Sequence, residues 1–119
     1  MRPIMSPRNW AFRIQDILKA VEKIETCTQG MSFEEFVEDR KTVDAVIRNL
    51  TTIGEAAIHI PEEVILKYPY VHWKEMKGMR NIVVHEYFGV SDRIIWATIQ
   101  KDPPVVNQQL LDLQEKIEE

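Results

Sequence analysis

Apolar side chains recur at steps of three and four residues along most of this 119-residue chain, and no other feature limits its fold so strongly. This spacing places apolar residues on one face of an α-helix, whereas a half-buried strand would alternate apolar and polar residues. The recurring positions are Trp10, Ile14, Ile17, Leu18, Val21 and Ile24, then Val43, Val46, Ile47, Leu50, Ile53, Ala57 and Ile58, and later Met76, Met79, Ile82 and Val83. Because the sequence shows no alternating pattern and no hairpin signal, the chain is predicted to be all-α.

Residues that typically begin or end helices divide this pattern into segments. They are Ser6-Pro7, Gly30, the pair Ser32 and Glu35, Pro61, Pro69, Ser91 or Asp92, and Asp102-Pro103, where the last helix is expected to restart or kink. We predict four to five main helices in an up-down bundle, with a short helix after Ser32 and one helical turn before Pro69. Repeats and obvious linkers are absent, so residues 1–119 are predicted to form a single domain.

The composition narrows the classes of function. The chain is 45% hydrophobic and 29% charged, which is typical of a soluble globular protein. Cys27 is the only cysteine, so no internal disulfide can form, and a cytoplasmic location is expected. We expect no membrane association, because no apolar run is long enough to span a bilayer and the N-terminus lacks the apolar core of a signal peptide. The net charge of −4 argues against a general nucleic-acid coat protein.

The segment GMRNIVVHEYFGVS, residues 78–91, gathers polar side chains that could perform chemistry on a phosphodiester. The guanidinium of Arg80 can hold a phosphate and oppose the charge that develops on it. The imidazole of His85 can take a proton from a ribose 2′-hydroxyl or give one to the leaving oxygen near neutral pH. This chemistry needs no metal, because RNA carries its own nucleophile. Lys77 lies one turn before Arg80 and adds local positive charge.

Helical geometry complicates a site built from this segment alone. On a regular helix Arg80 and His85 lie about 140° apart, and Tyr87 lies about 200° from His85, whereas Asn81 shares the face of His85. Two arrangements resolve this. The helix ends near Glu86 and Tyr87 folds back, or the segment lies at a two-fold interface where one chain's arginine meets the other chain's histidine.

Ordinary structural roles also fit these residues individually. His85 would then interact with a helix dipole, Arg80 would form a salt bridge and Tyr87 would belong to the core. Gly54 within a helix indicates close helix packing, and its neighbour Glu55 could place a carboxylate toward Arg80 as an accessory group. His59 and His72 have no metal-ligand spacing with His85, and HExxH and CxxC motifs are absent, so no metal site is predicted.

The segment RNIVVHEY has Arg80, four residues, His85, one residue and Tyr87, with Asn81 directly after the arginine. This pattern resembles the signature of the HEPN superfamily, and most closely its HepT-like toxins. The segments DILKAVEKI, SFEEFVEDRKTVDAVIRNLTTIGEAA, YPYVHWKEMKGMRNIVVHEYF and WATIQKDPP resemble that branch in the same order. The resemblance implies an α-helical bundle acting as a homodimer, with the motif at the dimer cleft. It assigns Arg80 to phosphate binding, Asn81 to orienting the phosphate or His85, and His85 to acid–base catalysis.

The resemblance also implies an activity and partners. It implies a metal-independent endoribonuclease toxin without a cofactor, acting on RNA and neutralised by a small nucleotidyltransferase antitoxin. That antitoxin would transfer AMP to Tyr87. The alternative is a helical module that binds a nucleotide or a partner enzyme without cutting RNA, because some HEPN domains are considered to act in this way.

Overall fold

The computed structural model describes the backbone of residues 7–86 and 92–118 and the side chains of residues 10–81 and 92–117. The described residues form six helices and no strand. The helices are α1 (Pro7–Thr28), α2 (Phe33–Glu38), α3 (Arg40–Ile58), α4 (Glu62–Lys67), α5 (Trp73–Glu86) and α6 (Asp92–Glu118). The all-α prediction is confirmed.

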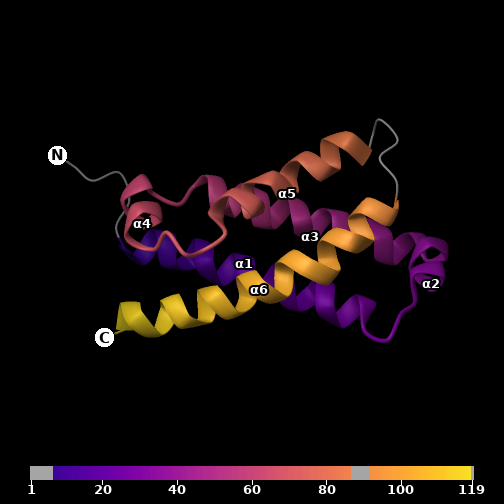
Figure 1. The fold of residues 1–119 in the computed structure, drawn as a ribbon, viewed down its shortest axis with the longest axis horizontal. Coiled ribbons are helices and arrows are strands. Elements are labelled where there is room, and N and C mark those ends of the chain that lie inside the picture. Colours follow the sequence, from indigo (N-terminus) through magenta and orange to yellow (C-terminus); the bar gives the residue numbers. More distant parts are fainter. Residues whose placement is uncertain (1–6, 87–91, 119) are drawn as a thin grey trace.

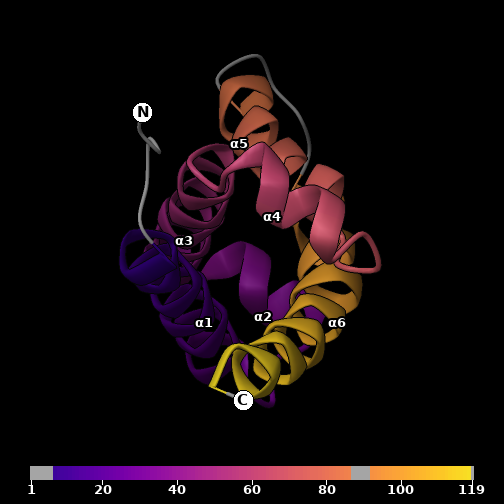
Figure 2. The ribbon, with the colours of Figure 1, turned by 90° about the vertical axis from the view of Figure 1, so that its left-hand side faces the viewer.

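The four long helices α1, α3, α5 and α6 run alternately in opposite directions along the long axis of the molecule (Figure 1). Viewed down that axis they surround one interior (Figure 2). Helix α3 packs against both α1 and α5, and α6 closes the bundle against α1. The predicted up-down bundle is therefore confirmed, with α2 and α4 as short connecting helices.

Local capping residues set several of these boundaries. Gly30 follows α1 with a φ of +77°, a conformation that favours glycine. Ser32 accepts from the Glu35 amide at 3.1 Å and donates its own amide to the Glu35 carboxylate at 2.8 Å, so the predicted capping box is confirmed. Asp39 accepts from the amide of Thr42 at the start of α3, and hydrogen bonding to the Thr42 side chain, followed by this amide contact, lowers the pKa of the Asp39 carboxyl below its usual value.

Of the restart or kink predicted at Asp102-Pro103, the restart is wrong, because α6 is continuous there. Helix α6 runs through Pro103 and Pro104, which cannot donate to the carbonyls one turn earlier. Packing offsets this loss, because Val106, Leu110 and Leu113 are fully buried beyond the prolines.

The core is apolar throughout. Among the described side chains no polar or charged residue is buried. Fully buried side chains come from α1, α2, α3, α5 and α6, and the largest are Ile14, Ile17, Ile24, Phe36, Leu50, Ile53, Met76, Met79, Ile95, Leu110 and Leu113. Within the described ranges no helix combines the length and apolarity needed to cross a bilayer.

Candidate active site

Helices α3 and α5 approach each other closely where Gly54 faces Arg80. A Cβ added at Gly54 would lie 2.7 Å from the Arg80 Cβ and 2.8 Å from the Arg80 backbone nitrogen. Real Cβ atoms essentially never come that close to other atoms, so only glycine fits without a shift of the helices. The close packing predicted for Gly54 is confirmed, and it fixes where Arg80 stands on the bundle.

Glu55 follows Gly54 and forms an ion pair with Arg80. The distance from Glu55 Oε1 to Arg80 Nε is 3.0 Å, and the two side chains are 48% and 50% exposed. The carboxylate of Glu55 therefore lies toward Arg80, as the sequence suggested. The two terminal nitrogens of the guanidinium provide further donors that a phosphate could bind.

The outer face of α5 is basic around this pair. Lys74, Lys77 and Arg80 follow one another at three-residue steps, and all three are exposed. Asn81, next to Arg80, is also exposed. This local positive charge is hidden in the overall net charge of −4. An anion approaching α5 near Arg80 would meet the positive charges of both Lys77 and Arg80, which lie about 60° apart around the helix.

The histidine and the tyrosine of the motif lie partly or wholly beyond what the structure describes. Helix α5 is described to Glu86, so Arg80 and His85 belong to one continuous helix and the angle of about 140° between them applies. The side chain of His85 and the whole of Tyr87 lie outside the described residues. The structure therefore brings Glu55 to Arg80 and leaves their relation to His85 and Tyr87 as a prediction.

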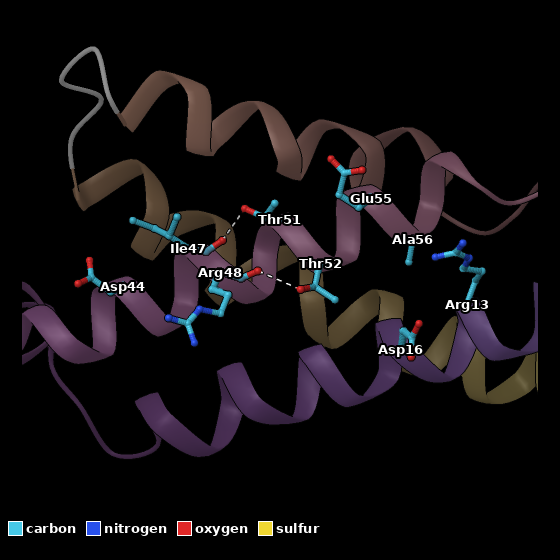
Figure 3. Close-up of a pocket in the computed structure, with 9 residues that line it drawn as sticks. All are labelled: Arg13, Asp16, Asp44, Ile47, Arg48, Thr51, Thr52, Glu55 and Ala56. Atoms are coloured by element: carbon cyan, nitrogen blue, oxygen red, sulfur yellow. Dashed lines mark hydrogen bonds between the residues drawn. The ribbon is translucent and has the colours of Figure 1, made fainter.

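A groove between α1 and α3 adjoins the ion pair and shares Glu55 with it. It has a volume of about 450 Å³ and is lined by Arg13, Asp16, Asp44, Ile47, Arg48, Thr51, Thr52, Glu55 and Ala56. Figure 3 shows Arg48 and Thr52 extending toward α1, whereas Glu55 stands on the edge of α3 nearer α5. Sequence analysis did not identify this groove, because its residues come from two helices and form no local motif.

The structure also bears on two further kinds of site considered from the sequence, a metal site and a reactive cysteine. Among the described residues no cluster of histidine, cysteine or carboxylate side chains could hold a metal ion. Partial burial raises the pKa of the Cys27 thiol, which makes the reactive thiolate less available. Neither the described metal-ligating side chains nor Cys27 therefore indicates a second reactive centre.

Comparison with known proteins identifies the family. The model of the ribonuclease HepT-like family matches residues 17–113, which include both α3 and the Arg80 to His85 segment. "Probable ribonuclease HepT" of Thermococcus cleftensis is 44% identical over 91 residues, covering 76% of this chain and 83% of that protein. "Putative RNase TTE0752" of Caldanaerobacter subterraneus subsp. tengcongensis is 42% identical over 103 residues, covering 87% and 92%. No solved structure matches the chain significantly. The chain belongs to the HepT-like ribonuclease family.

Proposed function

We propose that this chain is the toxin of a toxin–antitoxin pair and acts as a metal-independent endoribonuclease with Arg80 and His85 in its site. The family match over residues 17–113 carries this proposal, because it places the chain among ribonucleases and spans both residues. The exposed Arg80 on a basic helix face supports it physically. The RNA 2′-hydroxyl attacks the adjacent phosphorus, and the 5′-oxygen of the next nucleotide leaves.

Arg80 binds the scissile phosphate in this proposal. Its guanidinium offers a planar set of donors that matches phosphate oxygens and opposes the negative charge that grows as the nucleophile attacks. Lys77 raises the local positive potential, and the amide of Asn81 orients the phosphate or the imidazole of His85. His85 is the proton-transferring group, since imidazole changes its charge near neutral pH.

A homodimer brings Arg80 and His85 to the same phosphate. Both residues belong to α5, and a separation of about 140° around one helix directs them to different sides. In a symmetric pair, each site takes Arg80 from one protomer and His85 of the partner subunit, and the two-fold axis repeats the arrangement. The continuous α5 therefore favours the interface arrangement over a site built within one chain.

A small nucleotidyltransferase antitoxin inactivates the site by transferring AMP to Tyr87. The tyrosine lies two positions after His85, and an adenylyl group adds a bulky nucleotide with a negative phosphate. That phosphate competes for the anion site at Arg80 and repels RNA. This regulation does not require the helical bundle to change its fold, because the added charge acts within the site itself.

Incubation with the partner nucleotidyltransferase, ATP and Mg²⁺ is expected to raise the intact mass of the chain by at least one AMP unit. The variant Tyr87→Phe lacks the acceptor hydroxyl and should keep its unmodified mass. Tyr70, which precedes α5 and is 41% exposed, serves as the control tyrosine. A Tyr70→Phe chain should therefore be modified like the wild type. An unchanged wild-type mass would refute the modification.

Expression in a bacterial host tests the toxin role. The wild-type chain is expected to arrest growth, and His85→Ala is expected to remove the arrest while the helical fold, checked by circular dichroism of the purified protein, is retained. A non-catalytic binding module predicts the opposite, since its effect would not require an imidazole. Equal toxicity of the wild type and His85→Ala would support the binding module.

A further inference from the structure

Cleavage of RNA by its own 2′-hydroxyl involves two proton transfers. The 2′-oxygen loses a proton as it attacks phosphorus, and the 5′-oxygen gains one as the P–O bond breaks. One imidazole cannot act as the base and as the acid in the same step. A second proton-transferring group close to the phosphate held by Arg80 would therefore accelerate the transfer that water otherwise has to make.

The described structure offers one such group. Glu55 is the carboxylate that contacts Arg80, with Oε1 at 3.0 Å from Nε, and no other ion pair with Arg80 occurs among the described side chains. Because Glu55 contacts Nε, the two terminal nitrogens remain as donors for a phosphate. A phosphate bound there lies beside the carboxylate. Its half-exposed position also leaves Glu55 accessible to a ribose that enters from solvent.

Stability alone is a weak explanation for this ion pair. A half-exposed pair between flexible side chains contributes only about 0–1 kcal/mol, because water screens it. The close approach of α3 and α5 that brings the pair together nevertheless requires glycine at position 54, since a Cβ added there would lie 2.7 Å from the Arg80 Cβ. The fold thus holds a carboxylate against the candidate phosphate-binding arginine where little stability is gained.

We propose that Glu55 is the general base of the cleavage reaction. This inference rests on the proposed ribonuclease function. A Glu55 carboxylate oxygen takes the proton of the 2′-hydroxyl, and the 2′-oxygen forms a bond to phosphorus. The bond from phosphorus to the 5′-oxygen breaks, and protonated His85 of the partner subunit donates its proton to that oxygen. The products are a 2′,3′-cyclic phosphate and a 5′-hydroxyl, and no other reactant is consumed.

The variant Glu55→Gln tests this role with little change in shape. Glutamine keeps an oxygen that can face Arg80 but cannot take the proton, so a positioning role would survive in part and a base would be lost. Glu75→Gln is the matched control, because Glu75 is an exposed glutamate in the first turn of α5. We expect kcat on a short RNA to fall about 100-fold or more in Glu55→Gln with a small change in KM, and to stay unchanged in Glu75→Gln.

The pH profile separates a base from a structural residue. The wild type is expected to show a bell-shaped rate, whereas in Glu55→Gln hydroxide has to replace the carboxylate, so the rate should still rise with pH where that of the wild type has levelled off. Arg80 on α5 contacts Glu55, and the other charged side chains that line the adjoining groove are Arg13 and Asp16 on α1 and Asp44 and Arg48 on α3. A Glu55→Asp variant, which keeps a carboxylate, should retain the bell-shaped profile.

The outcomes distinguish this inference from the function on which it rests. If the wild type cleaves RNA, His85→Ala does not, and Glu55→Gln cleaves within about threefold of the wild type, Glu55 is not the base and the ribonuclease proposal stands. A loss in Glu55→Gln that appears only in KM also overturns the inference. If the wild type itself cleaves no RNA, both proposals fail. Circular dichroism and thermal unfolding of Glu55→Gln show that any loss comes from a folded protein.

Discussion

Replacing His85 with alanine is expected to reduce the rate of RNA cleavage by about 10²–10⁴-fold, the range that a positioned acid or base usually contributes. The methyl group of alanine cannot carry the proton to the leaving 5′-oxygen. Cleavage of a labelled RNA in excess EDTA measures the effect and tests metal independence in the wild type at the same time. Binding of RNA should change far less than kcat, because Arg80 remains in place.

His59→Ala is the control for this experiment. His59 is exposed directly after α3 and takes no part in the proposed chemistry. Its variant should cleave RNA at the wild-type rate. Equal activity of His85→Ala and His59→Ala would remove the imidazole from the mechanism, even if the chain cleaves RNA by another route.

Alanine at Gly54 is expected to destabilise the bundle, whereas alanine at Gly78 is expected to stabilise it. Both substitutions gain about 1 kcal/mol of helix propensity. Only at Gly54 does the new Cβ meet Arg80, at 2.7 Å, and nothing lies within 4 Å of a Cβ at Gly78. Overpacking of this kind costs about 1–3 kcal/mol, so the two variants should differ by about 2 kcal/mol in free energy of unfolding.

Thermal unfolding of the two variants measures this difference directly. A change of about 2 kcal/mol corresponds to roughly 6–10 °C in Tm for a domain of this size, with Gly54→Ala the lower. The propensity gain cancels in the comparison, so the difference reports the contact between α3 and α5. Equal stabilisation by both substitutions would show that the helices do not approach as closely as described.

Much of the fold could be predicted from local sequence signals. The capping box at Ser32 and Glu35 is a short-range device whose hydrogen bonds depend on three-residue spacing, and it forms as expected. The helix carrying Pro103 could not be predicted in the same way. A proline's local effect is to break a helix, but buried residues further along α6 keep the helix continuous, and burial depends on the whole bundle.

The candidate site was only partly accessible to sequence reasoning. Arg80 could be identified because it belongs to the polar motif of residues 78–91. Gly54 could be identified because glycine is unfavourable within a helix. Their contact could be suspected but not located, since it joins two residues 26 positions apart in the sequence and depends on how α3 and α5 cross. The groove lined by Arg13 and Arg48 gave no local signal, because its two sides come from α1 and α3.

The proposed reaction requires Arg80 of one protomer and His85 of the partner subunit to act on the same phosphate. Co-expression of Arg80→Ala and His85→Ala chains with different affinity tags allows the mixed dimer to be purified by both tags. Each homodimer should be inactive, and the mixed dimer should regain about half of the wild-type cleavage rate, because one of its two sites is complete. A mixed dimer as inactive as the two homodimers would contradict a site shared between subunits.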